Sequence, residues 1–150
     1  MNGSDKASLE RLSYVKIADG PVERSSLPAL HGMGTPGAFV SNFDELVRVT
    51  QSEIPLQDGV LPLPGEDPFF YATGRRPSFP VTLFDPATDP YSAAGLVDEA
   101  RRRNVRWVIV KRALQINGNP MPEFEQTMQL VQRDFALYRR LQGYDMYRRR

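Results

Sequence analysis

Two adjacent arginines follow a tyrosine and a glycine near the middle of the chain. These residues are Tyr71, Gly74, Arg75 and Arg76. Adjacent arginines on a loop can bind a phosphate or a carboxylate, because each guanidinium presents several N–H donors in one plane. They can equally anchor the loop by ion pairs to nearby aspartate or glutamate side chains. We favour the structural role and keep ligand binding as the alternative.

Two aspartates, Asp85 and Asp89, follow an expected strand at residues 79–84. Loops at the carboxyl ends of strands are where open α/β sheets bind ligands. Two carboxylates there could do acid–base chemistry or hold a hard metal ion. Each aspartate precedes a proline, however, and Asp-Pro is a common turn element. We therefore predict a turn at this position. The candidate ligand-binding residues of the chain are Tyr71, Arg75, Arg76 and Asp85.

Residues 32–37 match the pattern G-x-G-x-x-G, and His31 stands beside them. A dinucleotide site needs this motif between a buried strand and a helix, and the residues before it do not resemble a strand. Pro36 also removes a backbone N–H that could serve a phosphate. His31 is the only histidine and has no Ser-His-Asp order around it. We predict a Gly/Pro-rich loop and name no catalytic residue.

The composition is that of an ordinary globular protein and excludes several classes of site. The chain has 150 residues, of which 41% are hydrophobic and 25% are charged, and its formal net charge is +1. Such a small charge argues against a nucleic-acid binder. The absence of cysteine excludes disulfides, thiolate metal sites and cysteine nucleophiles. We expect no metal and no cofactor. No apolar run approaches the roughly 18 residues of a membrane span.

Helices and strands are expected to alternate along most of the chain. Apolar residues spaced by three and four positions predict helices. The first of these would be capped by Asn42, with Glu45 three residues later. The helices expected from this spacing cover residues 43–52, 92–103 and 122–134, with a short helical turn at 67–73. Residues 1–8 are expected to be a disordered lead, and residues 19–40 a long surface loop.

Short apolar runs predict the strands. A turn at Gly143 between the last two predicts an antiparallel hairpin. The expected strands cover residues 13–18, 60–63, 79–84, 105–111, 135–141 and 145–149. The order of elements predicts a single α/β domain over residues 9–150, with a layered, mostly parallel sheet, flanking helices and the hairpin at its C-terminal edge.

Several of these segments resemble a known family. They are V-L-P-L-P at residues 60–64, P-F-F-Y-A-T-G-R-R-P at 68–77, N-V-R-W-V-I-V at 104–110, and the tyrosine- and arginine-rich ending at 135–149. In order and spacing, residues 42–150 resemble the C-terminal soluble domain of bacterial polytopic membrane glycosyltransferases. These enzymes are related to dolichyl-phosphate-mannose protein mannosyltransferases and to lipid A aminoarabinose transferases.

The resemblance implies an accessory domain without catalytic residues of its own. Enzymes of this family use a polyprenyl-phosphate-linked sugar as donor, and their catalytic acid lies in the membrane portion. The domain would lie on the extracytoplasmic (periplasmic) face of the bacterial inner membrane. Its partners would be the membrane portion of the parent protein and a lipid-linked sugar or acceptor, not nucleic acid. The alternative is a freestanding α/β module that binds a nucleotide or another anionic ligand.

Overall fold

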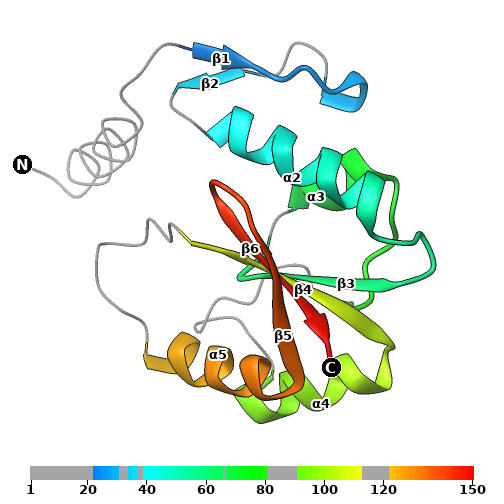
Figure 1. Ribbon diagram of the computed structural model, residues 1–150, viewed down its shortest axis with the longest axis vertical. Coiled ribbons are helices and arrows are strands. Elements are labelled where there is room, and N and C mark those ends of the chain that lie inside the picture. Colours follow the sequence, from blue (N-terminus) through cyan, green and yellow to red (C-terminus); the bar gives the residue numbers. More distant parts are fainter. Residues whose placement is uncertain (1–21, 31–33, 37–38, 66, 81–90, 113–121) are drawn as a thin grey trace, which may run out of the picture. The chain divides into compact units, whose positions relative to one another are not determined.

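The computed structural model describes residues 22–30, 34–36, 39–65, 67–80, 91–112 and 122–150 (Figure 1). Its contacts divide the chain into two compact units, Met1–Glu45 and Leu46–Arg150. The expected strand at residues 13–18, His31 and Asp85 lie outside the described residues. The candidate residues Tyr71, Arg75 and Arg76 all belong to the second unit.

The first unit contains a small two-stranded sheet. Strands β1 (Val22–Arg24) and β2 (Gly34–Pro36) pair antiparallel, and the 3₁₀ helix η1 (Pro28–Leu30) lies between them in the sequence. The prediction of a loop over residues 19–40 is therefore wrong for these segments. Pro36 is compatible with the pairing because it stands at the end of a two-stranded ribbon, where a missing N–H is tolerated. The glycine motif thus contributes a strand.

The second unit is built on a four-stranded sheet. Its strands are β3 (Gly59–Leu63), β4 (Val105–Lys111), β6 (Tyr144–Arg149) and β5 (Phe135–Arg140), in that spatial order. Strands β3 and β4 run parallel, and the β4–β6 and β6–β5 pairs are antiparallel. The α/β class and the C-terminal hairpin are confirmed. Pro62 lies on an edge strand, where its missing N–H breaks no inner ladder.

The sheet is mixed rather than mostly parallel, which corrects the prediction from sequence. The short turn after β5 forces β6 to run antiparallel to it, and β6 then lies beside β4. Only one parallel pair remains among the described strands. Phe79 and Pro80 lie in a bend instead of starting the expected strand, and residues 81–84 lie outside the described part of the chain.

Helices lie on both sides of this sheet. Helices α4 (Ala93–Arg102) and α5 (Pro122–Asp134) cover one face, whereas α3 (Asp67–Thr73) and the end of α2 (Phe39–Glu53) lie on the other (Figure 1). Helix α2 begins four residues before its predicted start, so Asn42 lies inside it and is not its cap. Val40 extends the apolar stripe of the helix toward its N-terminus and is buried.

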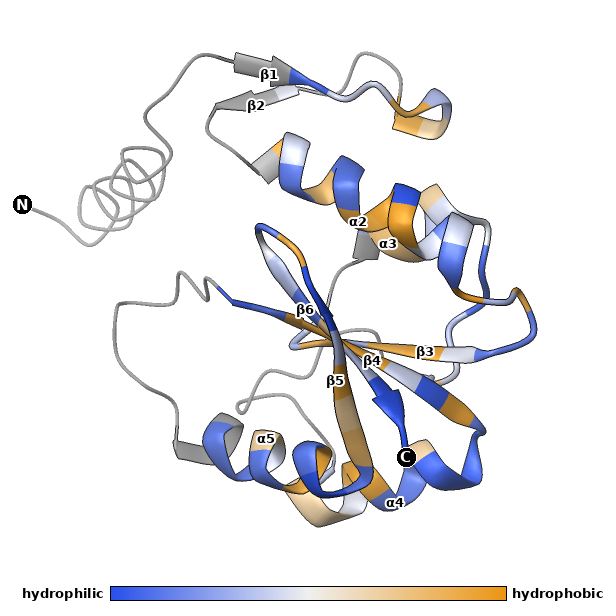
Figure 2. Cartoon of the chain, in the orientation of Figure 1, coloured by the Kyte–Doolittle hydropathy of each residue, from blue (hydrophilic) through white to orange (hydrophobic). Residues whose placement is uncertain are grey.

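A large hydrophobic cluster of the second unit lies between the sheet and helices α4 and α5. Strands β3 and β4 supply its centre, and Figure 2 shows hydrophobic residues along both strands. The α4 stripe Leu96, Val97 and Ala100 packs there as its helical spacing predicts. The described members of this cluster are Leu61, Leu63, Phe79, Leu96, Val97, Ala100, Val105, Val108, Val110, Val131, Phe135 and Tyr147.

Candidate ligand-binding site

Arg75 holds the backbone that follows helix α2. Its Nη1 atom donates to the carbonyl oxygen of Pro55 at 3.0 Å and to that of Asp58 at 3.4 Å. Its Nη2 atom donates to the carbonyl oxygen of Ile54. Its backbone N–H donates to the carbonyl oxygen of Phe70 at 3.2 Å, within the turn that ends α3. The side chain of Arg75 thus joins the end of α2 to the start of β3, and its backbone N–H joins both to the end of α3.

The position of Arg75 has a physical cause. The last carbonyl groups of a helix have no partner within it, and the helix dipole places partial negative charge there. A guanidinium supplies both donors and positive charge at that end. Burial lowers the pKa of Arg75, and the negative charge of Asp58 opposes this shift. An arginine remains protonated at physiological pH under such conditions, so it stays cationic.

Gly74 allows Arg75 to point back toward α2. Its φ is +68°, in the left-handed region that glycine adopts without strain. Its N–H donates to the carbonyl oxygen of Tyr71 at 3.4 Å, which closes the last turn of α3. This is a glycine-terminated helix end. The Tyr71–Gly74–Arg75 spacing therefore follows from how the chain stops one helix and caps another.

A hollow of about 450 Å³ lies beside this turn. It lies at the amino ends of β3 and β4, not at the carboxyl ends where open α/β sheets usually bind ligands. Three arginines and one carboxylate line it. The lining residues are Leu56, Gln57, Asp58, Gly59, Val60, Phe70, Gly74, Arg75, Arg76, Ser78, Arg103 and Asn104.

The structure brings only part of the predicted set together. Arg75 and Arg76 both line the hollow, whereas Tyr71 is not among its lining residues and is 72% exposed. Asp85 lies outside the described residues. Arg76 is exposed and has no polar partner among the described residues. The two adjacent arginines therefore have different surroundings: Arg75 binds backbone oxygens, and Arg76 faces solvent.

Arg103 is a lining residue that the sequence did not single out for this site. Its Nε atom donates to Glu99 Oε2 at 3.0 Å, and Nη1 donates to the carbonyl oxygen of Ser78 at 3.2 Å. Its guanidinium carbon also lies 5.5 Å from the centroid of the Phe79 ring. The sequence predicted the Glu99–Arg103 pair correctly, but it did not indicate that Ser78, in the chain after α3, lies next to Arg103.

Asp58 and Gly59 line the hollow at the point where β3 begins. Asp58 Oδ2 accepts a hydrogen bond from Trp107 Nε1 at 3.0 Å. A Cβ on Gly59 would stand 2.8 Å from the Asn104 carbonyl oxygen and 3.1 Å from the Val105 Cα. Glycine is therefore required for β3 to begin so close to β4. Asn104 has a φ of +55°, which asparagine tolerates better than most residues.

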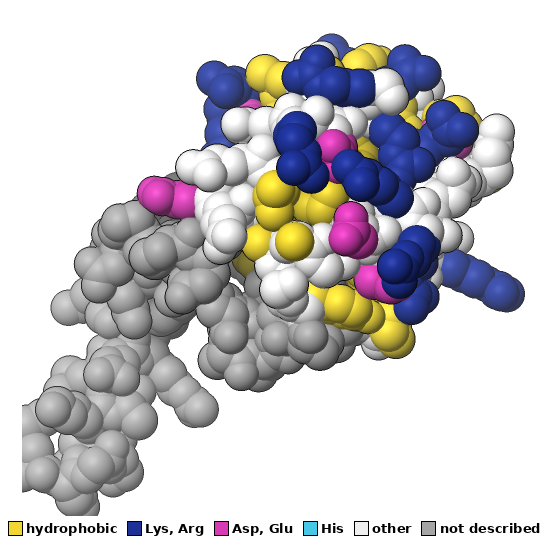
Figure 3. Space-filling view, turned by 90° about the horizontal axis from the view of Figure 1, so that it is seen from below, with side chains coloured by type: hydrophobic (Ala, Val, Ile, Leu, Met, Phe, Trp, Pro, Cys, Tyr) yellow, Lys and Arg dark blue, Asp and Glu magenta, His cyan; other side chains and the backbone are white. Residues whose placement is uncertain are grey.

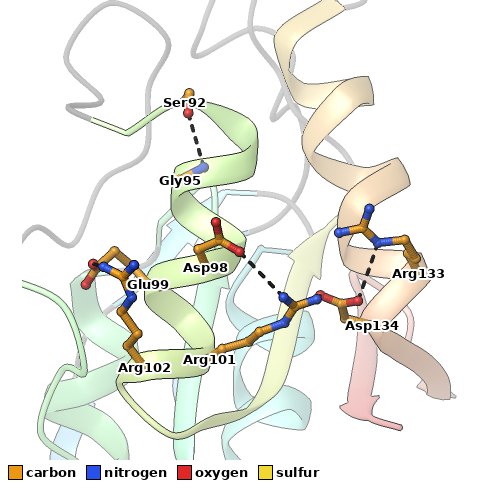
Figure 4. Close-up of polar contacts among 8 residues, drawn as sticks. All are labelled: Ser92, Gly95, Asp98, Glu99, Arg101, Arg102, Arg133 and Asp134. Carbon is orange, nitrogen blue, oxygen red and sulfur yellow. Dashed lines mark hydrogen bonds and ion pairs between the residues drawn. The ribbon is translucent and has the colours of Figure 1, made fainter.

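The arginine run at residues 101–103 belongs to a face of mixed charge. Figure 3 shows one face of the molecule, on which many basic side chains have carboxylates among them. Arg101 lies between Asp98, at 3.5 Å, and Asp134 (Figure 4). Arg102 pairs with Glu99 at 3.1 Å. The Arg101–Asp134 pair links α4 to α5, whereas Arg102 and Arg103 pair with Glu99 of α4 itself.

The second run, at residues 148–150, lies against aromatic rings. The Arg148 guanidinium carbon lies 5.5 Å from the centroid of the Trp107 ring, and that of Arg149 lies 5.9 Å from the centroid of the Phe135 ring. These distances are typical of cation–π contacts. The Arg150 backbone N–H donates to a carbonyl oxygen at the end of α5 at 3.0 Å. This run is therefore also part of the packing.

The buried carboxylate of Asp44, in the first unit, has a structural role. Ser25 Oγ donates to Asp44 Oδ1 at 2.7 Å, and the N–H and Oγ of Ser26 donate to Oδ2 at 2.8 and 3.0 Å. These donors fix the segment after β1 onto helix α2. The sequence did not mark this cluster, because its members are 18 and 19 residues apart.

The described residues show neither a metal cluster nor a membrane span. Within the described ranges, no group of three His, Cys, Asp or Glu side chains is placed to hold a metal ion. Among the helices that the structure describes, none is long and apolar enough to cross a bilayer. The candidate site among the described residues is the hollow lined by Arg75, Arg76 and Arg103.

Comparison with known proteins gave no significant match among protein-family models, curated proteins or solved structures. The resemblance to a glycosyltransferase domain consequently stays a prediction from sequence. The α/β fold, the Arg75 contacts and the arginine-lined hollow rest on the structure.

Proposed function

We propose that this chain is an accessory domain of a membrane glycosyltransferase that uses a polyprenyl-phosphate-linked sugar donor. The domain lies on the extracytoplasmic face and does not itself catalyse sugar transfer. The observation that carries the proposal is the role of Arg75 in the turn that resembles the family. Its guanidinium binds three backbone carbonyl oxygens, so the motif has the structural role that an accessory domain requires.

The rest of the turn supports this interpretation. Gly74 stops α3 in the left-handed conformation, and Phe69, in the preceding part of the motif, is fully buried. Along this segment Phe69 is buried in the core, Gly74 ends α3, and Arg75 caps α2. A motif with these roles specifies a folded body. The chemistry of transfer would then belong to the membrane portion of the parent protein.

Fractionation of the native host tests the location. An antibody raised against this chain is applied to membrane and soluble fractions after an alkaline carbonate wash. We expect the antigen in the washed membranes and expect external protease to remove it from spheroplasts. Detection only in the soluble fraction would contradict the proposal and favour the alternative, a freestanding module for an anionic ligand.

Sugar transfer in native membranes tests the accessory role. The parent gene is expressed with and without the region that encodes residues 46–150, and transfer from a radiolabelled polyprenyl-phosphate sugar is measured. We expect the deletion to reduce transfer and the purified 150-residue chain to show none. Transfer by the purified chain alone would overturn the proposal. A cytoplasmic protein unrelated to the enzyme serves as the negative control.

A further inference from the structure

We infer that the hollow beside Arg75 binds a phosphate group, with Arg76 and Arg103 as its charged ligands. The apolar part of the molecule that carries the phosphate would lie against Leu56. This site goes beyond the accessory role proposed above, and it does not depend on a membrane-bound parent. The inference rests on the charge of the hollow, on its unused donors and on its apolar rim.

The charge of the lining favours an anion. Three arginines, Arg75, Arg76 and Arg103, face one carboxylate, that of Asp58. One oxygen of that carboxylate already accepts the indole N–H of Trp107 at 3.0 Å. Glu99 pairs with Arg103 at 3.0 Å from outside the lining, so three arginines stand against two carboxylates and one positive charge remains in excess. Guanidinium groups prefer phosphate and carboxylate oxygens, which they bind through two parallel N–H donors.

The arginines also have donors left for a ligand. Arg76 has no partner among the described residues, so its whole guanidinium is available. The contacts of Arg103 within the described part of the chain use Nε and Nη1 and leave Nη2. Arg75 Nε is buried without a hydrogen-bond partner among the described residues. Because this Nε atom has almost no accessible surface, the donors open to a ligand are those of Arg76 and the Nη2 of Arg103.

Helix ends near the hollow do not cancel this charge. Helices α2 and α4 both finish beside it, and their carbonyl ends repel an anion. Arg75 binds the last carbonyl groups beyond α2, and Arg103, just after α4, carries its charge to the end of that helix. The two arginines thus offset the dipoles, and the charge of Arg76 adds to the site.

An apolar side chain stands on the rim of the same hollow. Leu56 lines it and is 77% exposed, the largest exposure among the large hydrophobic residues that the structure describes. Phe70 lines the hollow as a partly buried ring. Charged ligands beside apolar surface suit a phosphate ester better than a free inorganic ion. The phosphate of a soluble ester and that of a lipid headgroup share this chemistry.

Binding by the purified full chain tests the site. In one arm, inorganic phosphate, pyrophosphate and phenyl phosphate are titrated by calorimetry. In the other arm, sedimentation measures binding to phosphatidylcholine vesicles with and without phosphatidic acid. We expect binding in at least one arm, and phenyl phosphate to bind more tightly than inorganic phosphate. Binding to the soluble ester assigns a soluble ligand, and binding only to the anionic vesicles assigns a lipid headgroup.

Matched variants locate the binding. Arg76→Gln is expected to weaken binding about tenfold, because it removes a charge-assisted pair of hydrogen bonds. Arg140, on β5, lies level with the end of β4 away from the hollow and pairs with Asp145 at 3.1 Å; Arg140→Gln removes the same charge there and is expected to leave binding unchanged. Arg76→Lys, which keeps the charge alone, is expected to fall between. No binding in either arm, or equal weakening by Arg76→Gln and Arg140→Gln, would overturn the inference.

Discussion

The indole N–H of Trp107 donates to Asp58 Oδ2 at 3.0 Å, which ties the first half of β4 to the turn before β3. Trp107 is 3% exposed, so almost all of its side chain is removed from bulk water. The backbone oxygen of Asp58 accepts from Arg75 at 3.4 Å. One aspartate therefore links the sheet to the arginine that caps α2, and the geometry of the hollow depends on it.

Asp58→Ala is expected to lower the free energy of unfolding by about 2 kcal/mol. The substitution leaves the buried N–H of Trp107 without an acceptor, which costs about 1–3 kcal/mol. Urea denaturation followed by Trp107 fluorescence measures the loss, and this tryptophan is the only one in the chain. Asp58→Asn is the control, because it keeps an oxygen that can accept the bond. Equal midpoints for Asp58→Ala and the wild type would show that the bond contributes nothing.

Arg75→Ala is expected to lower the free energy of unfolding by about 2 kcal/mol, because three carbonyl oxygens lose a charged donor. Its neighbour provides a matched control. Arg76→Ala is expected to change stability by less than about 0.5 kcal/mol, as surface substitutions usually do. Thermal unfolding followed by circular dichroism measures both. If Arg75→Ala kept the wild-type melting temperature yet weakened transfer by the parent enzyme, Arg75 would have a functional role instead.

Gly59→Ala is expected to destabilise the chain by about 1–3 kcal/mol through overpacking. The new Cβ would stand 2.8 Å from the Asn104 carbonyl oxygen, and backbone atoms cannot yield as a flexible side chain can. Gly74→Asn is the comparison, since no atom lies within 4 Å of a Cβ there and asparagine tolerates its positive φ. We expect thermal unfolding to give Gly59→Ala a lower melting temperature than Gly74→Asn. The reverse order would mean that β3 can move away from β4 at little cost.

Tyr138 is expected to titrate above the ordinary tyrosine pKa, near 10. Its O–H donates to Glu53 Oε2 at 3.0 Å, and this hydrogen bond is the main cause that raises the pKa of Tyr138. Desolvation and the negative charge of Glu53 act in the same direction. The folded chain therefore holds the proton to higher pH than the unfolded chain. The resulting stability is present below about pH 10 and is lost as the pH rises through the folded pKa.

Phenolate absorbance measures this titration as the difference between the wild type and Tyr138→Phe. Glu53→Gln keeps an acceptor oxygen but removes the charge, so it should move the Tyr138 transition to lower pH. Glu53→Gln also removes the ion pair between Glu53 and Arg139. An unchanged transition in Glu53→Gln would show that the charge of Glu53 does not control the pKa of Tyr138.

Much of the second unit follows from local sequence patterns. The bounds of β4 and α5 match the prediction. The spacing of the apolar residues and the types of the flanking residues are local properties, so the sequence alone can predict such bounds. Ser92 caps α4 through its Oγ, which accepts the Gly95 N–H at 3.1 Å. The start of α2 was missed, since a capping pattern at Asn42 also fits the interior of a helix. The relative direction of the strands was only partly predicted, because local patterns do not show which strands become neighbours in the sheet.

The amino-acid sequence by itself determined the alternation of helices and strands, the C-terminal hairpin and the adjacent arginines at positions 75 and 76. Only the tertiary structure decided what those arginines do. Arg75 reaches carbonyl oxygens 17 to 21 residues earlier in the chain, and Arg103 joins the hollow from 25 residues beyond Ser78. Such contacts depend on which strands pair and where each helix stops. Those relations arise from packing across the whole sheet, and no local run of residues encodes them.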